Sequence, residues 1–405
     1  MEVSKRTPTV KELVDEALAL EAGLNRPLRY VQVNSVPYGS TGGIMLRLHR
    51  GLVARGIDSR VCWGRGRAAE ETSELNFGSK LGVITDAALT RFDGRAGFHS
   101  RAATKRLISF MDKFDPDVVH LHNLHGYFVN VEMLFEWLAR HRCQVRWTLH
   151  DCWAFTGHCA HFTYVKCAQW QSHCAYGKPC PQLDTYPKTI SRRSCARNFE
   201  DKKSIFTSIP QGRMTLITPS HWLAELVERS FLKDYVVEVR HNTVDGSVFK
   251  PTPSVFRERY GIADRFMILG VASPWTERKG LGDFVRLARE LDSDRYVIVL
   301  IGLSKRQIKV LSSKKIIALP RAKSAQELAE AYTAADVFVH PGLEETFGMT
   351  VAEAGSCGTS VIIRKGTACE EAAQGTFFES IDLGFEPLRS AIVRLSQGMS
   401  RDFSS

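Results

Sequence analysis

Two glutamates eight residues apart form the most distinctive chemical pattern in this chain. Glu345 and Glu353 lie in the stretch EETFGMTVAE, residues 344–353, with Phe347 and Gly348 between them. On one continuous helix, eight positions would turn the second side chain roughly 80° past the first and carry it roughly 12 Å along the axis. The two carboxylates would not meet, so we expect a loop followed by the start of a helix.

A helix that begins near Met349 would give this stretch an anion-binding end. The preceding pattern DVFVHP predicts a strand, which places Glu345 in the loop after it and Glu353 about one turn into the helix. Free N–H groups at Gly348, Met349 and Thr350 would bind phosphate, and glycine lets a phosphate approach the backbone closely. One carboxylate can bind sugar hydroxyls and the other a ribose. The alternative is two solvated glutamates beside a helix.

Two adjacent cations follow another predicted strand. Arg278 and Lys279 lie in SPWTERKG, residues 273–280, just before a helix expected from Leu281. Such a pair can neutralise a diphosphate that carries its charge into a leaving group. The alternative is a basic loop on the surface.

The first half of the chain offers a weaker phosphate signal. Gly42 and Gly43, in YGSTGGIML, follow the first strand pattern, where their N–H groups could meet a phosphate at a helix start. The segment is not G-x-G-x-x-G, and the next strand lacks the acid that would bind a ribose. We therefore expect no dinucleotide site here.

Histidines follow two further strands of the first half. His150 and Asp151 end the pattern QVRWTLHD, so His150 could donate a hydrogen bond to a sugar hydroxyl or a phosphate oxygen. The segment HLHNLHG carries His120, His122 and His125. In an alternating strand at least one of these three is expected to be a core residue.

The strand and helix patterns alternate twice along the chain. Alternation of this kind predicts a parallel, doubly wound sheet. It stops after about residue 151, resumes, breaks at the turn-rich segment NTVDGSVFKP, residues 242–251, and then restarts. We expect an α/β fold with two Rossmann-like sheets that face a cleft at their carboxyl ends, where ligands of open sheets bind.

The expected organisation has three parts. Residues 1–27 form an N-terminal helical extension, residues 28–245 a first Rossmann-like domain with a cysteine-rich insertion at 152–187, and residues 246–405 a second Rossmann-like domain. The C-terminal helix is a candidate to pack back on the first domain. We find no apolar run of about 18 residues and no signal-peptide pattern, so we expect a cytoplasmic protein.

The insertion concentrates half of the ten cysteines. Four of them, Cys159, Cys167, Cys174 and Cys180, are the best candidates for a closed structural zinc site. Their spacing lacks a C-x2-C pair, so disulfide or redox chemistry and unliganded thiols remain open. The aromatic residues of the insertion could stack on sugar rings or form its small core: Trp153, Phe155, Trp170 and Tyr176.

The charge balance favours anionic partners. The chain has 54 lysines and arginines against 44 acids, a formal net charge of +10. Nucleic acid, an anionic leaflet and phosphorylated substrates are all compatible with this excess, as is ordinary solvation. We expect the basic segment 188–203 to dock on an anionic leaflet rather than on nucleic acid.

Taken together, these segments resemble a known family. The chain looks like the retaining GT-B glycosyltransferases of family 4, and within them is similar to bacterial exopolysaccharide transferases of the colanic-acid type. The resemblance runs from about residue 28 to 361. It rests on the Gly-Gly pair and on TLHD, ITPS, HNTVDGSVFKP, ERKG and EETFGMTVAEAGSCGTSVI.

The resemblance implies roles for individual residues. Glu345 would contact the donor sugar, Glu353 would bind the nucleotide ribose, and Lys279 would bind the diphosphate. The family's arginine stands several residues earlier, where this chain has Pro274, so Arg278 is the candidate substitute. The family's active-site histidine corresponds to His150. Ser360, where the family often has proline, affects only a loop.

The resemblance implies that residues 28–245 form the acceptor-side domain and that residues 246–405 bind the nucleotide-sugar. It also implies an activity. It is a retaining transfer, without a catalytic metal, from a nucleotide-sugar to a hydroxyl of a glycan or of a lipid-diphosphate-linked acceptor, with UDP favoured and GDP next. The enzyme would act in surface polysaccharide synthesis, peripherally on the inner face of the membrane. One alternative is a non-catalytic binding protein on the same scaffold; another is a zinc-dependent nucleic-acid binder, which we do not favour.

Overall fold

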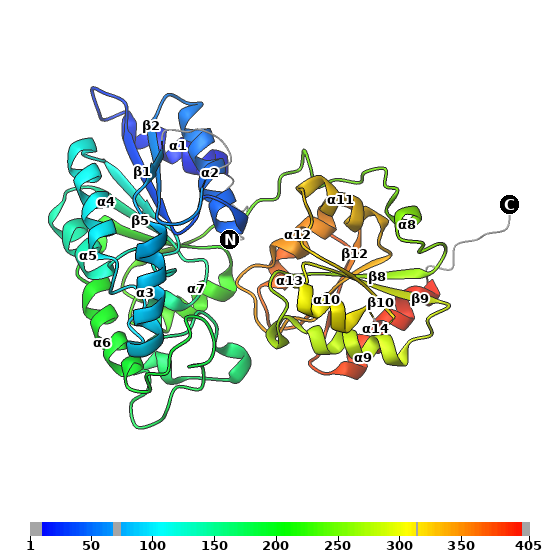
Figure 1. Ribbon diagram of the computed structural model, residues 1–405. Coiled ribbons are helices and arrows are strands. Elements are labelled where there is room, and N and C mark those ends of the chain that lie inside the picture. The colour runs from blue at the N-terminus through cyan, green and yellow to red at the C-terminus, as the bar shows by residue number, and fades with distance from the viewer. Residues whose placement is uncertain (1–9, 68–73, 313–314, 399–405) are drawn as a thin grey trace, which may run out of the picture. The chain divides into compact units, whose positions relative to one another are not determined.

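A computed structural model describes residues 10–67, 74–312 and 315–398 (Figure 1). The first nine residues of the expected N-terminal extension lie outside these ranges. The chain divides into two compact units, Met1–Asn242 and Thr243–Ser405. Each unit contains its own parallel sheet with helices on both faces, which confirms the predicted fold class of two Rossmann-like domains.

The first unit is built on a seven-stranded sheet. Its strands lie in the order β3-β2-β1-β4-β5-β6-β7, and every pairing is parallel. This order is the one expected when the chain winds from the centre of a sheet first to one edge and then to the other. The strands are β1 (Arg29–Asn34), β2 (Asp58–Trp63), β3 (Glu74–Asn76), β4 (Val118–Leu121), β5 (Gln144–Thr148), β6 (Met214–Thr218) and β7 (Val236–Val239).

Alternation along the strands sends apolar side chains to both faces of this sheet. In β1, Val31 and Val33 join the large core beneath α4, α5 and α6, whereas Tyr30 joins the smaller core beneath α1 and α2. The helices are α1 (Val10–Glu21), α2 (Gly39–Val53), α3 (Lys80–Asp93), α4 (Arg101–Phe114), α5 (Val131–Arg140), α6 (Ser194–Phe206) and α7 (His221–Glu228).

The second unit repeats the design with six parallel strands in the order β10-β9-β8-β11-β12-β13. Its strands are β8 (Phe266–Val271), β9 (Tyr296–Ile301), β10 (Ile316–Leu319), β11 (Val337–His340), β12 (Ser360–Arg364) and β13 (Phe378–Ile381). Its helices are α8 (Phe256–Arg259), α9 (Leu281–Glu290), α10 (Lys305–Leu311), α11 (Ala325–Ala334), α12 (Met349–Ser356), α13 (Cys369–Ala372) and α14 (Phe385–Gly398).

Four edge strands have no counterpart in the sequence patterns. They are β3 and β7 at the edges of the first sheet, and β10 and β13 at the edges of the second. An edge strand is covered on fewer sides than a central one, so it does not need an apolar run. The strand β13, for example, reads FESI and buries only Ile381.

The insertion between β5 and α6 is irregular, as predicted. Its regular structure is limited to three short 3-10 turns, Trp153–Phe155, Thr163–Val165 and Gln169–Gln171. Trp153, Phe155 and Trp170 are buried in the core of the first unit, so these rings pack the domain and do not stack on a ligand. Tyr176 remains exposed.

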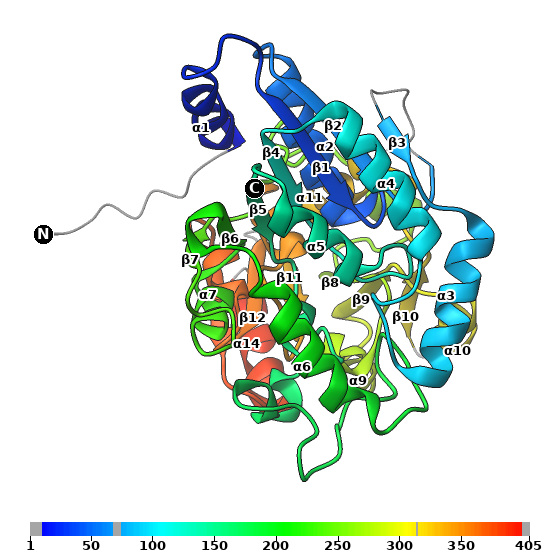
Figure 2. The ribbon, with the colours of Figure 1, turned by 90° about the vertical axis from the view of Figure 1, so that its left-hand side faces the viewer.

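The helix α3 turns a polar face inward. Its buried residues are Asp86 and Thr90, and Asp86 accepts hydrogen bonds from the hydroxyls of Thr90 (3.2 Å) and of Ser100. Its apolar residues face solvent instead, and Figure 2 shows the helix at the margin of its unit. The exposed residues are Leu81, Ile84, Leu89 and Phe92. In the described chain, no helix is long and apolar enough to cross a membrane.

The burial of a leucine predicts how far its truncation lowers the free energy of unfolding, and Leu107 and Leu81 are at opposite extremes of burial. Leu107 of α4 is fully buried, so Leu107→Ala is expected to lower the free energy of unfolding by about 2–5 kcal/mol. Leu81→Ala removes the same atoms from a side chain that is 75% exposed. This substitution should change the free energy of unfolding by less than about 0.5 kcal/mol. Urea denaturation measures both. Equal losses in the two variants would contradict this account of α3.

Candidate functional site

Two loops meet at the carboxyl edge of the second sheet, after the neighbouring strands β8 and β11. The N–H of Leu343 donates to the carbonyl oxygen of Arg278 at 2.9 Å, and Nη1 of Arg278 donates to the carbonyl oxygen of Glu344 at 2.6 Å. Gly280 has a φ of 77°, and a Cβ there would lie 2.5 Å from Cγ of Pro341. Glycine is thus needed for the two loops to touch.

This contact brings two predicted cations and one further histidine together around the predicted carboxylate of Glu345. The amine of Lys279 forms an ion pair with Glu345. Nη1 of Arg278 lies 3.9 Å from the same oxygen, Oε1 of Glu345, and Nε2 of His340 lies 3.4 Å from it. Glu345 therefore organises two cations and an imidazole at the edge where ligands of open sheets bind.

The surroundings shift the protonation of these groups. Burial, with the Arg278 charge adding to it, lowers the pKa of Lys279 to about 7, whereas direct contact with the Glu345 carboxylate favours the charged amine. Burial and the Lys279 charge lower the pKa of His340 to about 3. His340 is therefore neutral near pH 7 and can donate or accept a hydrogen bond without adding charge.

The sequence reasoning missed His340 and its partner Cys369. The thiol of Cys369 lies 3.7 Å from Nδ1 of His340, and both side chains are buried. His340 is the last residue of β11, so its place at the carboxyl end of a strand was a signal that could have found it. Cys369 comes from α13, which only the tertiary structure places here.

The helix α12 begins at Met349, as predicted. Its N-cap is Gly348, with a φ of 102° and no side chain to cap the first turn. A Cβ at Gly348 would lie 2.9 Å from Sγ of Cys369. The N–H groups of the first turn, which include those of Met349 and Thr350, have no partner within the helix, and such groups can bind an anion. Phe347 is buried in the apolar core, where it anchors the loop.

Glu353 lies just over one turn inside α12. Its Oε2 accepts a hydrogen bond of 3.1 Å from the hydroxyl of Tyr332, a fully buried residue of α11. Burial, then the Glu353 carboxylate, raises the pKa of Tyr332, so the phenol remains a donor. Tyr332 thereby fixes one oxygen of Glu353, a role that the sequence did not indicate.

The glycine pair of the first unit lies deeper in its helix than predicted. The helix α2 begins at Gly39 and not at the glycine pair, so Gly42 and Gly43 follow its first three residues. The N–H groups at the open end belong to residues 39–41 instead. Gly42 has a packing role, because a Cβ there would lie 2.8 Å from the carbonyl oxygen of Val36.

His150 ends a chain of hydrogen-bonded histidines. Nε2 of His122 lies 3.2 Å from Oε1 of Gln32, and Nδ1 of His122 lies 3.1 Å from Nε2 of His150. Since Gln32 presents a carbonyl oxygen, His122 donates to it and accepts a hydrogen bond from His150. Nδ1 of a neutral His150 is then an acceptor, not the donor that we expected from the sequence.

The other histidines of this segment are structural, as anticipated for at least one of them. His120 is buried between the hydroxyl of Tyr30 at 2.8 Å and that of Thr148 at 2.7 Å. His125 donates to Asp151 at 2.6 Å. Burial raises the pKa of Asp151, but His125 and the N–H of Trp153 outweigh it and hold that pKa below its usual range.

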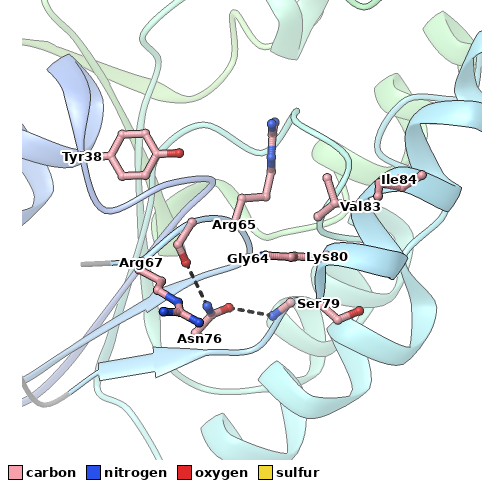
Figure 3. A pocket seen from close by; sticks show the side chains of 11 residues that line it. Tyr38, Gly64, Arg65, Arg67, Asn76, Ser79, Lys80, Val83 and Ile84 are labelled. Atoms are coloured by element: carbon pink, nitrogen blue, oxygen red, sulfur yellow. Dashed lines mark hydrogen bonds between the residues drawn. The ribbon is translucent and has the colours of Figure 1, made fainter. Parts of the chain in front are cut away.

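A pocket of about 960 Å³ opens beside α3 in the first unit (Figure 3). Its floor is held by Asn76, which donates to the carbonyl oxygen of Gly66 at 3.0 Å and accepts from the N–H of Gly78 at 3.2 Å. No carboxylate is among the described residues that line the pocket. Its lining includes three cations, Arg65, Arg67 and Lys80, and the apolar side chains of Val83 and Ile84.

The four cysteines of the predicted zinc set lie near one another in the insertion. Cys159 interacts electrostatically with the thiols of Cys167, Cys174 and Cys180. Within the described ranges, no three of these sulfur atoms lie within 4.8 Å of one another. A fifth thiol, that of Cys195 in α6, is hydrogen-bonded to Cys180.

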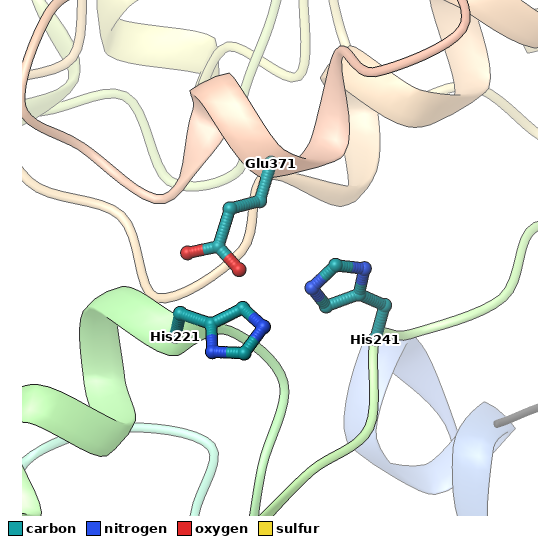
Figure 4. Close-up of side chains that lie close together, drawn as sticks. All are labelled: His221, His241 and Glu371. Carbon is teal, nitrogen blue, oxygen red and sulfur yellow. The ribbon is translucent and has the colours of Figure 1, made fainter. Parts of the chain in front are cut away.

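Two more histidines form a separate pair in the first unit. His221 is the first residue of α7 and His241 follows β7, and their rings meet edge to face with centroids 6.1 Å apart (Figure 4). Glu371, also labelled there, belongs to α13 of the second unit. Two imidazoles alone do not complete a metal site.

The basic segment 188–203 is less uniform than its sequence. Lys202 is fully buried, with its amine donating to the carbonyl oxygens of Trp153 (2.8 Å) and Thr156 (3.0 Å). It therefore cannot dock on a membrane, contrary to the expectation. The other cations of the segment are exposed: Lys188, Arg192, Arg193, Arg197 and Lys203.

Comparison with family models covers both units. Residues 44–247 match the model described as Glycosyltransferase Family 4, and residues 255–376 match the model described as Glycosyl transferases group 1. A solved structure of sucrose-phosphate synthase from Thermosynechococcus elongatus has a TM-score of 0.65. It covers 91% of this chain and 90% of its own at 14% identity, which shows a shared fold.

Two relatives are similar over part of the chain. A protein of Escherichia coli K12 named as a colanic acid biosynthesis glycosyl transferase, WcaC, is 29% identical over 46% of this chain and 47% of its own. The alpha-galactosylglucosyldiacylglycerol synthase of Streptococcus pneumoniae is 25% identical over 40% of this chain and 46% of its own. The matched part thus spans about half the length of each relative.

The buried histidines predict a loss of stability in acid. Burial lowers the pKa of His150 to about 4, so between pH 6.5 and 4 the unfolded chain binds a proton that the folded chain does not. This group alone should lower the free energy of unfolding by about 2 kcal/mol at pH 5 relative to pH 7. Thermal unfolding followed by tryptophan fluorescence suits the test, because six of the seven tryptophans lie in the first unit.

The variant His150→Asn should weaken this dependence. It removes the titrating group, so the unfolding temperature should fall less between pH 7 and pH 5 than in the parent chain. Identical pH profiles for the two proteins would contradict the burial of His150 as the cause.

Proposed function

Because the chain belongs to glycosyltransferase family 4, we propose that it is a retaining glycosyltransferase that uses a nucleotide-sugar, with UDP preferred over GDP. The acceptor is a hydroxyl of a glycan or lipid-diphosphate-linked chain in surface polysaccharide synthesis. The observation that carries the proposal is the cluster of Lys279, Arg278 and Glu345 at the edge of the second sheet. It adjoins a helix start that has no capping side chain.

The cluster suits the stabilisation of a diphosphate leaving group. Lys279 and Arg278 supply positive charge where the bond to the diphosphate breaks, and the N–H groups at the start of α12 add partial positive charge. Before the donor binds, Glu345 holds the amine of Lys279 in place. Because two side-chain cations already serve the leaving group, the proposed transfer requires no catalytic metal.

The proposed reaction proceeds without an enzymic nucleophile. The bond from the sugar to the diphosphate breaks, the acceptor oxygen bonds to the same face of the sugar, and the departing diphosphate takes the acceptor proton. Glu345 contacts the donor sugar and Glu353 binds the ribose, with Tyr332 fixing one of its oxygens. His150 accepts a hydrogen bond from a sugar hydroxyl. Positioning and charge stabilisation then supply the rate.

The pocket beside α3 supports an acceptor that carries a diphosphate and a lipid. Its cations, Arg65, Arg67 and Lys80, suit phosphate oxygens, and the exposed apolar face of α3 begins at the same place. An apolar helix face next to cations is the combination that binds an anionic leaflet. We propose that α3 lies on the inner face of the membrane and presents the acceptor diphosphate to this pocket.

Nucleotide binding tests the donor assignment. In a thermal-shift screen against UDP, GDP, ADP, CMP and dTDP, we expect UDP to raise the unfolding temperature most. The variant Glu353→Ala should lose this shift, since it lacks the ribose contact, and Tyr332→Phe should weaken it by about 0.5–1.5 kcal/mol of binding free energy. The matched control is Glu386→Ala, an exposed glutamate of α14, which should keep the full shift.

Separate outcomes test nucleotide binding and sugar transfer. A nucleotide shift that persists in Glu353→Ala would refute the ribose role. Binding without any donor hydrolysis or transfer, in the parent chain supplied with UDP-sugars and GDP-sugars, would favour the non-catalytic alternative. Lys279→Ala should lower the rate at least about 100-fold, because it removes a charge that stabilises the leaving group. Lys279→Arg should restore part of it.

Vesicle binding tests the membrane assignment. The double variant Leu81→Gln/Ile84→Gln removes two exposed apolar side chains and should weaken binding to phosphatidylglycerol vesicles about tenfold or more. Val53→Gln, a change at an exposed apolar residue of α2, is the control and should have no effect. Cosedimentation at low and high salt separates the apolar contribution to binding from the electrostatic one. Equal binding by all three proteins would exclude α3 as the contact.

A further inference from the structure

The irregular insertion has little of its own to hold it in shape. Between β5 and α6 the backbone forms only three short 3-10 turns, so ladder hydrogen bonds do not define its path. Loops of this length in compact domains usually need a functional or structural constraint. Five thiols gather where the insertion meets α6: Cys159, Cys167, Cys174, Cys180 and Cys195.

Three of the thiols accept backbone hydrogen bonds at sulfur. The N–H of Gly157 donates to Sγ of Cys174 at 3.2 Å. Cys167 and Cys180 each accept from the N–H two residues further along, at Gln169 and Gln182. Hydrogen bonds from N–H groups to sulfur favour the thiolate, the form that binds metal, whereas burial acts against it and raises the pKa of Cys159, Cys167 and Cys174.

The thiol of Cys195 differs from these three. Cys195 is fully buried in α6 and makes its hydrogen bond to Cys180 rather than to the backbone. It is therefore placed to donate to the sulfur of a neighbouring ligand, as second-layer partners of metal ligands do.

A buried cation accompanies the cluster. The amine of Lys202 is hydrogen-bonded to the carbonyl oxygens of Trp153 and Thr156 and lies 3.5 Å from the centre of the Trp153 ring. In the described ranges no carboxylate oxygen lies within 4.0 Å of this amine, which interacts with the thiols of Cys159 and Cys174 and, beyond that distance, with the Asp151 carboxylate. A buried amine needs a compensating negative charge, and a zinc ion with four thiolates carries two.

We propose that Cys159, Cys167, Cys174 and Cys180 bind one structural Zn²⁺, with Cys195 donating a hydrogen bond to the sulfur of Cys180 and Lys202 balancing the charge. Four thiols lose their protons on binding. Zinc–sulfur bonds of about 2.3 Å require the sulfur atoms to come closer than they lie now. The ion then fixes the insertion next to α6.

Metal analysis of the full chain tests the proposal directly. Protein purified without chelator should contain about one zinc per chain. Each of Cys159→Ser, Cys167→Ser, Cys174→Ser and Cys180→Ser should lower this to near zero. The matched control is Cys143→Ser, a change at a buried cysteine of the same unit outside the insertion, which should keep the full content. Cys195→Ala should also keep it, with faster release to a chelator.

Two further measurements keep the outcome clear. Cobalt added to the metal-stripped parent chain should give the intense visible bands of tetrahedral cobalt–thiolate sites, which requires no variant to fold. Nucleotide thermal shifts of the serine variants report on the second unit, so failure of the zinc proposal is distinguishable from failure of the proposed activity. Zinc-free parent protein without those cobalt bands would overturn the proposal, as would a native disulfide between Cys180 and Cys195.

Discussion

A parallel sheet must bury both of its faces, and this constraint decides where the chemistry of this protein can lie. Helices cover each face of both sheets, so side chains along the central strands are used for packing. Polar groups within the strands, such as Tyr30 and His120, are hydrogen-bonded to one another, and groups that can reach a ligand gather where strands end. In the second unit the loops after β8 and β11 leave the sheet side by side, and Lys279 and Glu345 meet there. The site is a consequence of strand order.

Glycines make that meeting possible. Gly280 lets its loop touch Pro341, and Gly348 lets the start of α12 approach Cys369. Both have positive φ angles, where a side chain would be strained as well as crowded. The close approach brings a neutral imidazole, two cations and a carboxylate to an open helix end, an arrangement that favours an anionic ligand.

The first unit uses the same architecture for different purposes. The carboxyl end of its sheet carries a chain of neutral histidines that orients His150 as an acceptor. Its outer helix α3 has the reverse of the usual amphipathic orientation, with Asp86 and Thr90 buried and apolar residues exposed. Such a helix is costly for a protein in water alone, and its position beside a basic pocket gives the exposed face a use.

The sequence by itself determined the fold class, the strands of both sheet centres and the start of α12. It also placed Glu345, Lys279 and Arg278 after strands and Glu353 about one turn inside a helix. These follow from local patterns: apolar runs, helix starts and glycines at turns. Only the tertiary structure decided which residues from other segments lie next to these predicted elements and side chains. The edge strands, His340, Cys369, Tyr332 and Cys195 come from segments distant in sequence, and whether Lys202 is buried or exposed depends on what packs over it. Local patterns carry no record of such contacts, because packing between distant segments sets them.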